Sequence, residues 1–158
     1  MNNHQRIVVG IDGSDYSPAA LRVAGRMAAA LNAPVDVITC LGWSDFSLPS
    51  RLPPGNLEAP EQLEAVARRL VDQAIERAYG MDRPADLTVT VKVGSPAKVL
   101  VEESRNAQLL VVGRRGHGGL LGQVVGSVSA ACSAHAHCPV LVVGDEFPAD
   151  NEPHEPGT

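Results

Sequence analysis

The chain has 158 residues, and a single domain most often holds about 100–150, so its length predicts one domain with a sizeable core. The formal net charge is −5, which gives no general attraction to nucleic acid or to an anionic membrane surface. Hydrophobic residues make up 44% of the chain but aromatic residues only 3%, so the core must be aliphatic, as in a parallel sheet buried on both faces.

The first part of the chain predicts two strands separated by a helix. Residues 6–11 are mostly apolar and stop at Asp12-Gly13-Ser14, which is typical of a buried strand ending in a turn. A helix is expected from about residue 15, with Pro18 in its first turn, where proline is tolerated. Residues 34–40 predict the second strand.

The remaining elements continue the alternation of helices and strands. Residues 42–60 are rich in proline and glycine and predict a long connection without regular structure. A helix follows to about Gly80, then a strand over 87–93 and a helix that begins at Pro96 and runs to about Asn106. A strand over 108–112, a helix over 127–137 and a strand over 139–143 complete the domain, and the acidic, proline-rich residues 145–158 predict a disordered tail.

This alternation predicts one α/β domain, residues 1–144, with a doubly wound, five-stranded parallel sheet and helices on both faces. In such sheets ligands bind beyond the carboxyl ends of strands where the strand order reverses. The order 3-2-1-4-5 places Asp12 and Gly113 on the two sides of that reversal. The order 2-1-3-4-5 would move Gly113 away from it, so we expect the first.

Glycines are spaced around the end of the fourth strand as a phosphate-binding backbone requires. The chain reads Gly113-Arg114-Arg115-Gly116, then nine residues, then Gly126-Ser127 at the start of a helix. Glycine permits positive φ and close approach of a ligand, and a helix start presents N–H groups and a positive dipole end to an anion. Ser127 is expected at the helix cap. A glycine-rich surface loop without a ligand is the competing interpretation.

Better-known nucleotide and hydrolase motifs are absent from the sequence. It contains no G-x-x-x-x-G-K-[ST], no G-x-G-x-x-G after the first strand and no G-x-S-x-G. A P-loop NTPase, a nicotinamide dehydrogenase and a serine esterase are therefore disfavoured. Asp12 has two open interpretations, a cap for the first helix or an acceptor for an adenine amino group or a ribose hydroxyl.

The glycine spacing, Asp12 after the first strand and the final strand 139–143 together resemble the universal stress protein family over about residues 5–144. The resemblance implies the ATP-binding branch, with Mg²⁺ or Mn²⁺ held through the phosphates. It implies adenine contacts from Asp12 and from the end of the second strand, about Cys40. It implies phosphate and ribose contacts from Gly113, Gly116, Gly126, Ser127 and Val128. The sequence departs from the family's usual pattern at Gln108 and at Thr39-Cys40. The candidate nucleotide site comprises Gly10, Ile11, Asp12, Cys40, Gly113, Arg114, Gly116, His117, Gly126, Ser127 and Val128.

The resemblance implies a nucleotide-dependent regulatory or stress-response protein. Catalysis of phosphoryl transfer needs a base or water-positioning group and a neutralising charge, and this loop offers Arg114, Arg115 and His117 but no lysine. We therefore expect slow or absent ATP hydrolysis. A weak ATPase or adenylate-handling enzyme using His117 or Asp12, and a cAMP-binding protein of the same fold, remain alternatives.

The last predicted strand indicates how the protein assembles, and the N-terminal residues indicate where it is located. Residues 139–143 form an edge strand in the expected order and are too apolar to remain open, which predicts a homodimer through this strand. The N-terminal residues lack an apolar signal-peptide core and no stretch reaches membrane-span length, so a cytoplasmic protein is expected. His135 and His137 with Cys132 and Cys138 match no zinc spacing, so no metal ligands are assigned.

Overall fold

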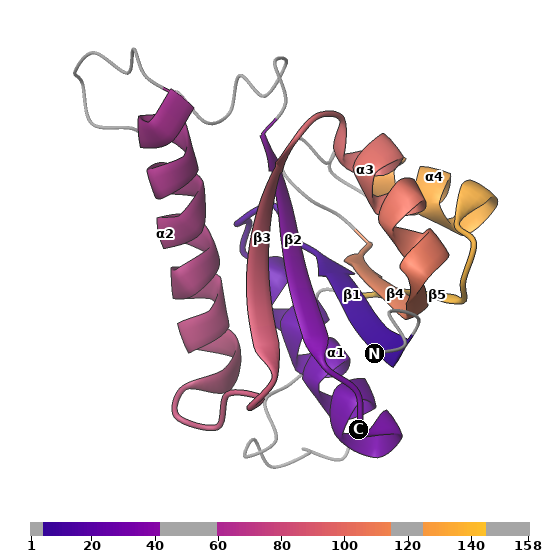
Figure 1. The fold of residues 1–158 in the computed structure, drawn as a ribbon, viewed down its shortest axis with the longest axis horizontal. Coiled ribbons are helices and arrows are strands. Elements are labelled where there is room, and N and C mark those ends of the chain that lie inside the picture. Colours follow the sequence, from indigo (N-terminus) through magenta and orange to yellow (C-terminus); the bar gives the residue numbers. More distant parts are fainter. Residues whose placement is uncertain (1–4, 42–59, 115–124, 145–158) are drawn as a thin grey trace, which may run out of the picture.

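The computed structural model describes residues 5–41, 60–114 and 125–144. The predicted tail, 145–158, and nearly all of the predicted connection, 42–60, lie outside the described residues, although Pro60 begins a helix. The elements in chain order are β1 (Arg6–Gly10), α1 (Ser17–Leu31), β2 (Val35–Leu41), α2 (Pro60–Tyr79), β3 (Leu87–Val93), α3 (Pro96–Glu103), the 3₁₀ turn η3 (Ser104–Asn106), β4 (Ala107–Gly113), α4 (Ser127–His135) and β5 (Val140–Val143) (Figure 1).

The five strands form one parallel sheet in the order β3-β2-β1-β4-β5. This confirms the predicted fold class and strand order. The chain starts in the middle of the sheet, adds β2 and β3 on one side of β1, and then crosses to the other side to add β4 and β5. Ile7 of β1 pairs with Val35 of β2 and with Leu109 of β4, so the two neighbours of β1 are held level with it.

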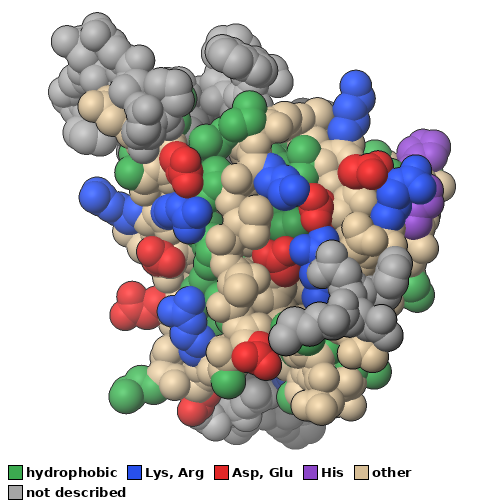
Figure 2. All heavy atoms as spheres, viewed as in Figure 1, with side chains coloured by type: hydrophobic (Ala, Val, Ile, Leu, Met, Phe, Trp, Pro, Cys, Tyr) green, Lys and Arg blue, Asp and Glu red, His purple; other side chains and the backbone are tan. Residues whose placement is uncertain are grey.

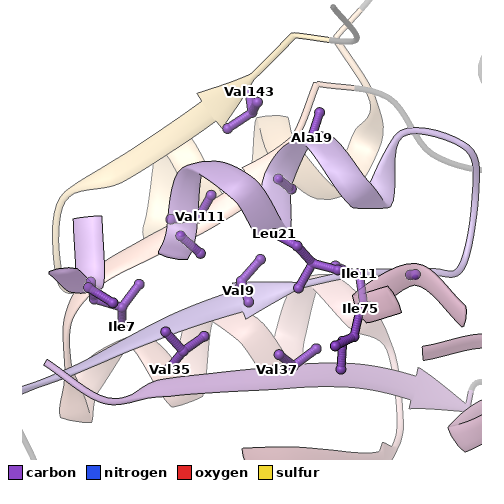
Figure 3. Packing of buried hydrophobic residues seen from close by; sticks show 14 of the residues in the cluster. Ile7, Val9, Ile11, Ala19, Leu21, Val35, Val37, Ile75, Val111 and Val143 are labelled. Atoms are coloured by element: carbon purple, nitrogen blue, oxygen red, sulfur yellow. The ribbon is translucent and has the colours of Figure 1, made fainter. Parts of the chain in front are cut away.

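Helices cover both faces of the sheet, with α1 beside α2 and α3 beside α4 (Figure 1). Because side chains alternate along a strand, each strand feeds two cores. Ile7 and Val9 of β1 pack in the cluster that includes Leu21 of α1 and Ile75 of α2 (Figure 3). Val8, between them, packs in a second cluster with residues of α3 and α4. The core is aliphatic, as the composition predicts.

Two helix ends differ from the sequence prediction. The helix from Pro96 is α-helical only to Glu103 and tightens into η3 over its last turn. The helix predicted over 127–137 ends at His135, and the N–H of His137 donates to the buried Ser104 hydroxyl at 2.9 Å. That hydroxyl replaces a continued helical bond, so a contact between distant segments sets the end of α4.

A network of charged side chains joins α3 to the sheet. Arg6 of β1 donates to the carboxylates of Asp36 on β2 and Glu103 at the end of α3, and Lys92 of β3 also pairs with Glu103. Asp36 is buried, and its Oδ1 accepts hydrogen bonds from Thr88 and Thr90 of β3 at 3.2 and 3.0 Å. Figure 2 shows acidic and basic side chains interspersed over the face in view. One ionic partner, Arg6, and two threonine hydroxyls thus satisfy the buried carboxylate of Asp36.

The ion pairs of Glu103 predict loss of stability in acid. Burial alone would raise the pKa of Glu103, but hydrogen bonds and charge from Lys92 and Arg6 hold this pKa below its ordinary 4.5. The folded state therefore binds this proton less readily than the unfolded chain. The stabilisation from Glu103 is present above about pH 4.5 and is lost as the pH falls through the lowered pKa.

We expect Glu103→Gln to lower the free energy of unfolding by about 1–2 kcal/mol at neutral pH. The difference from the parent protein should shrink below about pH 4, as measured by urea denaturation across pH. Glu102→Gln is the matched control, because Glu102 pairs with Arg105 on the exposed surface at 3.0 Å. A stability difference for Glu103→Gln that is independent of pH would contradict the assignment.

Candidate functional site

The carboxyl ends of β1 and β4 lie side by side at the point where the strand order reverses. Gly10 pairs with Val112, so the next residues along the two strands are Ile11 and Gly113. Ile11 donates its N–H to the carbonyl of Ile38 on β2 at 3.0 Å, and its side chain is buried in the core with α1 and α2. The structure thus brings the predicted residues 10–12 and 113–114 to one edge of the sheet.

Asp12 organises the turn between β1 and α1. Its Oδ1 accepts a hydrogen bond from the N–H of Ser14 at 2.9 Å and another from the hydroxyl of Ser17 at 3.3 Å. Gly13, between them in the chain, has a φ of +75°, which glycine adopts without strain. The helix-cap interpretation of Asp12 is wrong, because the N-cap of α1 is Tyr16 and no side chain caps it. Asp12 is exposed at the carboxyl edge, with its carboxylate held by the turn.

Gly10 is a glycine because of packing inside the fold. A Cβ added to it would lie 2.5 Å from Cδ1 of Leu100 and 3.0 Å from Cδ2. Leu100 belongs to α3 and is buried, so it has little room to move away. The absence of a side chain at Gly10 lets α3 approach β1 next to the carboxyl edge.

Backbone hydrogen bonds join the two ends of the glycine segment, the stretch of chain from Gly113 to Gly126. Arg114 donates its N–H to the carbonyl of Val143 at 2.7 Å, and its own carbonyl accepts the N–H of Gly126 at 2.8 Å. The buried hydroxyl of Ser129 lies 3.2 Å from the Arg114 carbonyl and 3.0 Å from the Gly126 carbonyl. The ends of β4 and β5 and the start of α4 therefore meet at Arg114. Gly116 and His117, which were predicted to contribute, lie outside the described residues.

α4 begins at Ser127, as predicted, but its N-cap lies one residue earlier than the cap predicted from the sequence. Gly126 is the N-cap, with φ −61° and ψ 155°, and Ser127 is the first helical residue and not the cap. The first bond within the helix runs from the N–H of Ala130 to the carbonyl of Gly126 at 3.0 Å. The N–H groups of Ser127 and Val128 precede this bond, as at every helix start. Gly126 has an ordinary φ, so its conformation alone does not require glycine.

Cys40 lies near the carboxyl end of β2, the neighbour of β1 on its other side. It pairs with Lys92 of β3, is half-buried and packs against the core that includes Leu100. Its position is one strand away from Asp12 at the same edge. The structure thus places another predicted residue at the same edge of the sheet, one strand away from the reversal of strand order.

Within residues 5–41, 60–114 and 125–144, no group of three His, Cys, Asp or Glu side chains is placed to hold a metal ion. Burial, with a smaller contribution from Cys138, raises the pKa of Cys132 to about 11. Burial also raises the pKa of Cys138. Both thiols are therefore protonated at neutral pH, which makes them poor metal ligands and poor nucleophiles.

Ser129 is the residue at this edge that the sequence prediction missed. It contacts Arg114 across fifteen positions of the chain, and the glycine spacing carries no sign of that contact. The available signal is local, because a serine in the first turn of a helix can reach carbonyl groups just before the helix. Recognising it requires the start of the helix to be known.

Comparisons with known proteins agree with this arrangement. The model of the Universal stress protein family matches residues 3–144. Universal stress protein Rv1996 of Mycobacterium tuberculosis (strain ATCC 25618 / H37Rv) is 32% identical over 162 residues, which cover 95% of this chain and 51% of that protein. The chain thus spans about half the length of the curated relatives it matches.

Solved structures show the same fold. A crystal structure of a universal stress protein in complex with cAMP is 31% identical, with a TM-score of 0.60 over 90% of this chain and 98% of that chain. Universal stress protein UspA from Lactobacillus plantarum is 23% identical, with a TM-score of 0.67 over 89% of this chain and 97% of that chain. The second likeness concerns the fold alone.

The close approach of α3 to β1 predicts a stability cost for a side chain at residue 10. Gly10→Ala should lower the free energy of unfolding by about 1–3 kcal/mol in the absence of any ligand, because its Cβ would overlap Leu100. Urea denaturation measures this change. Leu100→Ala and the double variant complete a mutant cycle, in which the double variant should lose less than the sum of the two single changes. Additive losses would show that the two sites do not touch.

Proposed function

The chain belongs to the universal stress protein family, and from that premise we propose that it is a nucleotide-binding regulatory protein whose ligand is ATP. The observation that carries the proposal is the junction at the sheet reversal. There, the end of β4 is paired with β1 and is hydrogen-bonded through Arg114 to Gly126 at the N-terminus of α4. Main-chain N–H groups at a helix start are suited to an anion such as a phosphate chain.

Each predicted site residue has a place in this proposal. The phosphates and ribose would contact Gly113 and Arg114, the segment containing Gly116 and His117, and the N–H groups of Ser127 and Val128. Gly126 would let the ligand approach the backbone closely. The adenine would lie toward Ile11, Asp12 and Cys40, with the Asp12 carboxylate as acceptor for its amino group. Gly10 would contribute its backbone, since its lack of a side chain is required by Leu100.

A divalent cation would be held by the nucleotide and not by a protein cage. The N–H groups at the start of α4 suit phosphate oxygens and not cations. Mg²⁺ or Mn²⁺ would therefore arrive with ATP and shield the charge of its phosphates. Asp12 Oδ1 accepts two hydrogen bonds from its own turn, which suits a fixed acceptor better than a proton carrier. We therefore propose slow or absent hydrolysis, with a weak ATPase as the alternative.

Cyclic AMP is the second candidate ligand, because a universal stress protein 31% identical to this chain has been solved in complex with it. Both nucleotides share adenine, ribose and a phosphate, and they differ in the length of the anionic chain. If the glycine segment binds the outer phosphates, ATP should displace cAMP from a common site. Preferential retention of cAMP in a competition experiment would favour the second candidate.

We propose that the protein acts in the cytoplasm, where ATP is abundant, and that neither membrane nor nucleic acid is a partner. The net charge of −5 offers no general attraction to phosphate backbones. No helix in the described ranges is long and apolar enough to cross a bilayer. The regulatory role rests on the family and on the absence of a P-loop lysine motif from the sequence.

Charge placed at residue 126 tests the phosphate site directly. Asp and Asn are both better N-caps than glycine, and both accept the extended conformation of Gly126, so either variant should fold. Gly126→Asp adds a negative charge at the helix start. It should weaken ATP binding by about a hundredfold relative to Gly126→Asn, as measured by calorimetry. Equal ATP affinity in the two variants, or no ATP binding by the parent protein, would contradict the proposal.

We also propose that two copies pair through β5. Leu141 and Val142 are 36% and 39% exposed on this edge strand, and residues 140–143 carry no charge to discourage pairing. The chain spans about half the length of its curated relatives, which leaves room in those proteins for a second unit of this size. A dimer of this chain would contain two such domains, as many as the length of one of these relatives could hold.

Leu141→Lys should convert this dimer into a monomer, because a lysine opposes edge-to-edge strand pairing. Light scattering at micromolar concentration measures the mass. Val93→Lys is the matched control, since Val93 is 70% exposed on the opposite edge strand, β3, and should leave the dimer intact. A parent protein that scatters as a monomer would refute pairing through β5.

A further inference from the structure

The hydroxyl of Ser129 is buried inside the junction between β4 and α4. The residue is only 2% exposed, on the first turn of α4. Its Oγ lies 3.0 Å from the carbonyl of Gly126 and 3.2 Å from the carbonyl of Arg114, and it shares its single hydrogen between them. A buried hydroxyl that donates to two carbonyls from different segments ties those segments together.

The two carbonyls are those that flank the glycine segment. The Arg114 carbonyl also accepts the N–H of Gly126 at 2.8 Å, and the Gly126 carbonyl also accepts the N–H of Ala130 at 3.0 Å. Each of the two oxygens thus accepts one hydrogen bond from a backbone N–H and one from the Ser129 hydroxyl. A carbonyl oxygen turned toward a bound phosphate would repel it, because both groups are hydrogen-bond acceptors with negative charge.

We propose that Ser129 is a positioning residue for the nucleotide phosphates. Its hydroxyl holds the carbonyls of Arg114 and Gly126 inward, so that the N–H groups at the start of α4 face the anion without competing acceptors. Ser129 has no contact with the nucleotide in this arrangement and acts through the backbone. The inference rests on the proposed phosphate site and deepens it.

The arrangement predicts a loss of affinity that depends on phosphate. Ser129→Ala removes the shared hydrogen bond and leaves the carbonyls freer to turn. ATP should bind about fivefold more weakly to this variant, which corresponds to the loss of one neutral hydrogen bond. Adenosine, which carries no phosphate, should bind the variant and the parent with nearly equal affinity. A loss caused by general destabilisation would reduce the affinity for both ligands.

Ser133→Ala is the matched control. The hydroxyl of Ser133 donates to the carbonyl of Ser129 at 2.8 Å, one turn further along α4. The variant therefore removes a serine hydroxyl bound to a backbone carbonyl of the same helix, but away from the junction. Calorimetry with ATP should give the parent affinity for Ser133→Ala.

Amide hydrogen exchange without nucleotide separates this inference from the proposed function. The Gly126 N–H donates to the Arg114 carbonyl, so Ser129→Ala should speed its exchange several-fold, while Ser133→Ala should not. If Ser129→Ala speeds exchange of the Gly126 N–H but the parent protein binds no ATP, the proposed function and the positioning role are both refuted. Ser129 would then have a structural role alone. Parent-like ATP affinity of Ser129→Ala, or equal losses for ATP and adenosine, would overturn the positioning role while the phosphate site remains.

Discussion

The pairing of β1 on both of its edges is the constraint on which the rest of the structure depends. Ile7, Val8 and Val9 have no exposed surface, because neighbouring strands flank them and helices cover both faces. The central position of β1 forces the chain to place β2 on one side and β4 on the other. The helices that follow β1 and β4 pack on opposite faces, so the carboxyl ends of these two strands lie at the reversal of strand order, where ligands bind in sheets of this kind.

Small residues allow the helices to approach this sheet and each other closely. Gly10 gives room to Leu100 of α3, and Gly25 of α1 gives room to Tyr79 of α2, whose ring would lie 2.8 Å from an added Cβ. The Tyr79 hydroxyl donates to the carbonyl of Leu21, and burial raises the pKa of Tyr79 well above its ordinary value. With few aromatic residues, the fold uses one tyrosine to join α1 and α2 and aliphatic side chains elsewhere. The lack of a side chain at Gly10, a predicted site residue, is thus explained by helix packing.

The strand order could be predicted because Gly113 follows the fourth strand, and a ligand-binding glycine is expected where the strand order reverses. Only the order 3-2-1-4-5, of the two considered, places the fourth strand at that reversal. The strand over 87–93 was predicted with its observed bounds, since its apolar residues are flanked by clear breakers. The end of α4 was wrong because it depends on Ser104, which is distant in sequence. The cap of α4 was wrong because both Gly126 and Ser127 suit a cap position, and the bond between Gly126 and Arg114 decides between them. Local patterns contain neither contact.

The hydrogen bonds of Arg114 connect two features that the sequence treats separately. Its N–H binds the carbonyl of Val143 on the edge strand β5, and its carbonyl binds Gly126 at the start of α4. Arg114 therefore links the strand that we propose pairs between copies to the helix start that we propose binds phosphate. One hydrogen bond joins Arg114 to each of them. Ser129 adds a third bond at the same carbonyl. Arg114 is therefore bonded through its backbone both to the end of the edge strand β5 and to the start of α4.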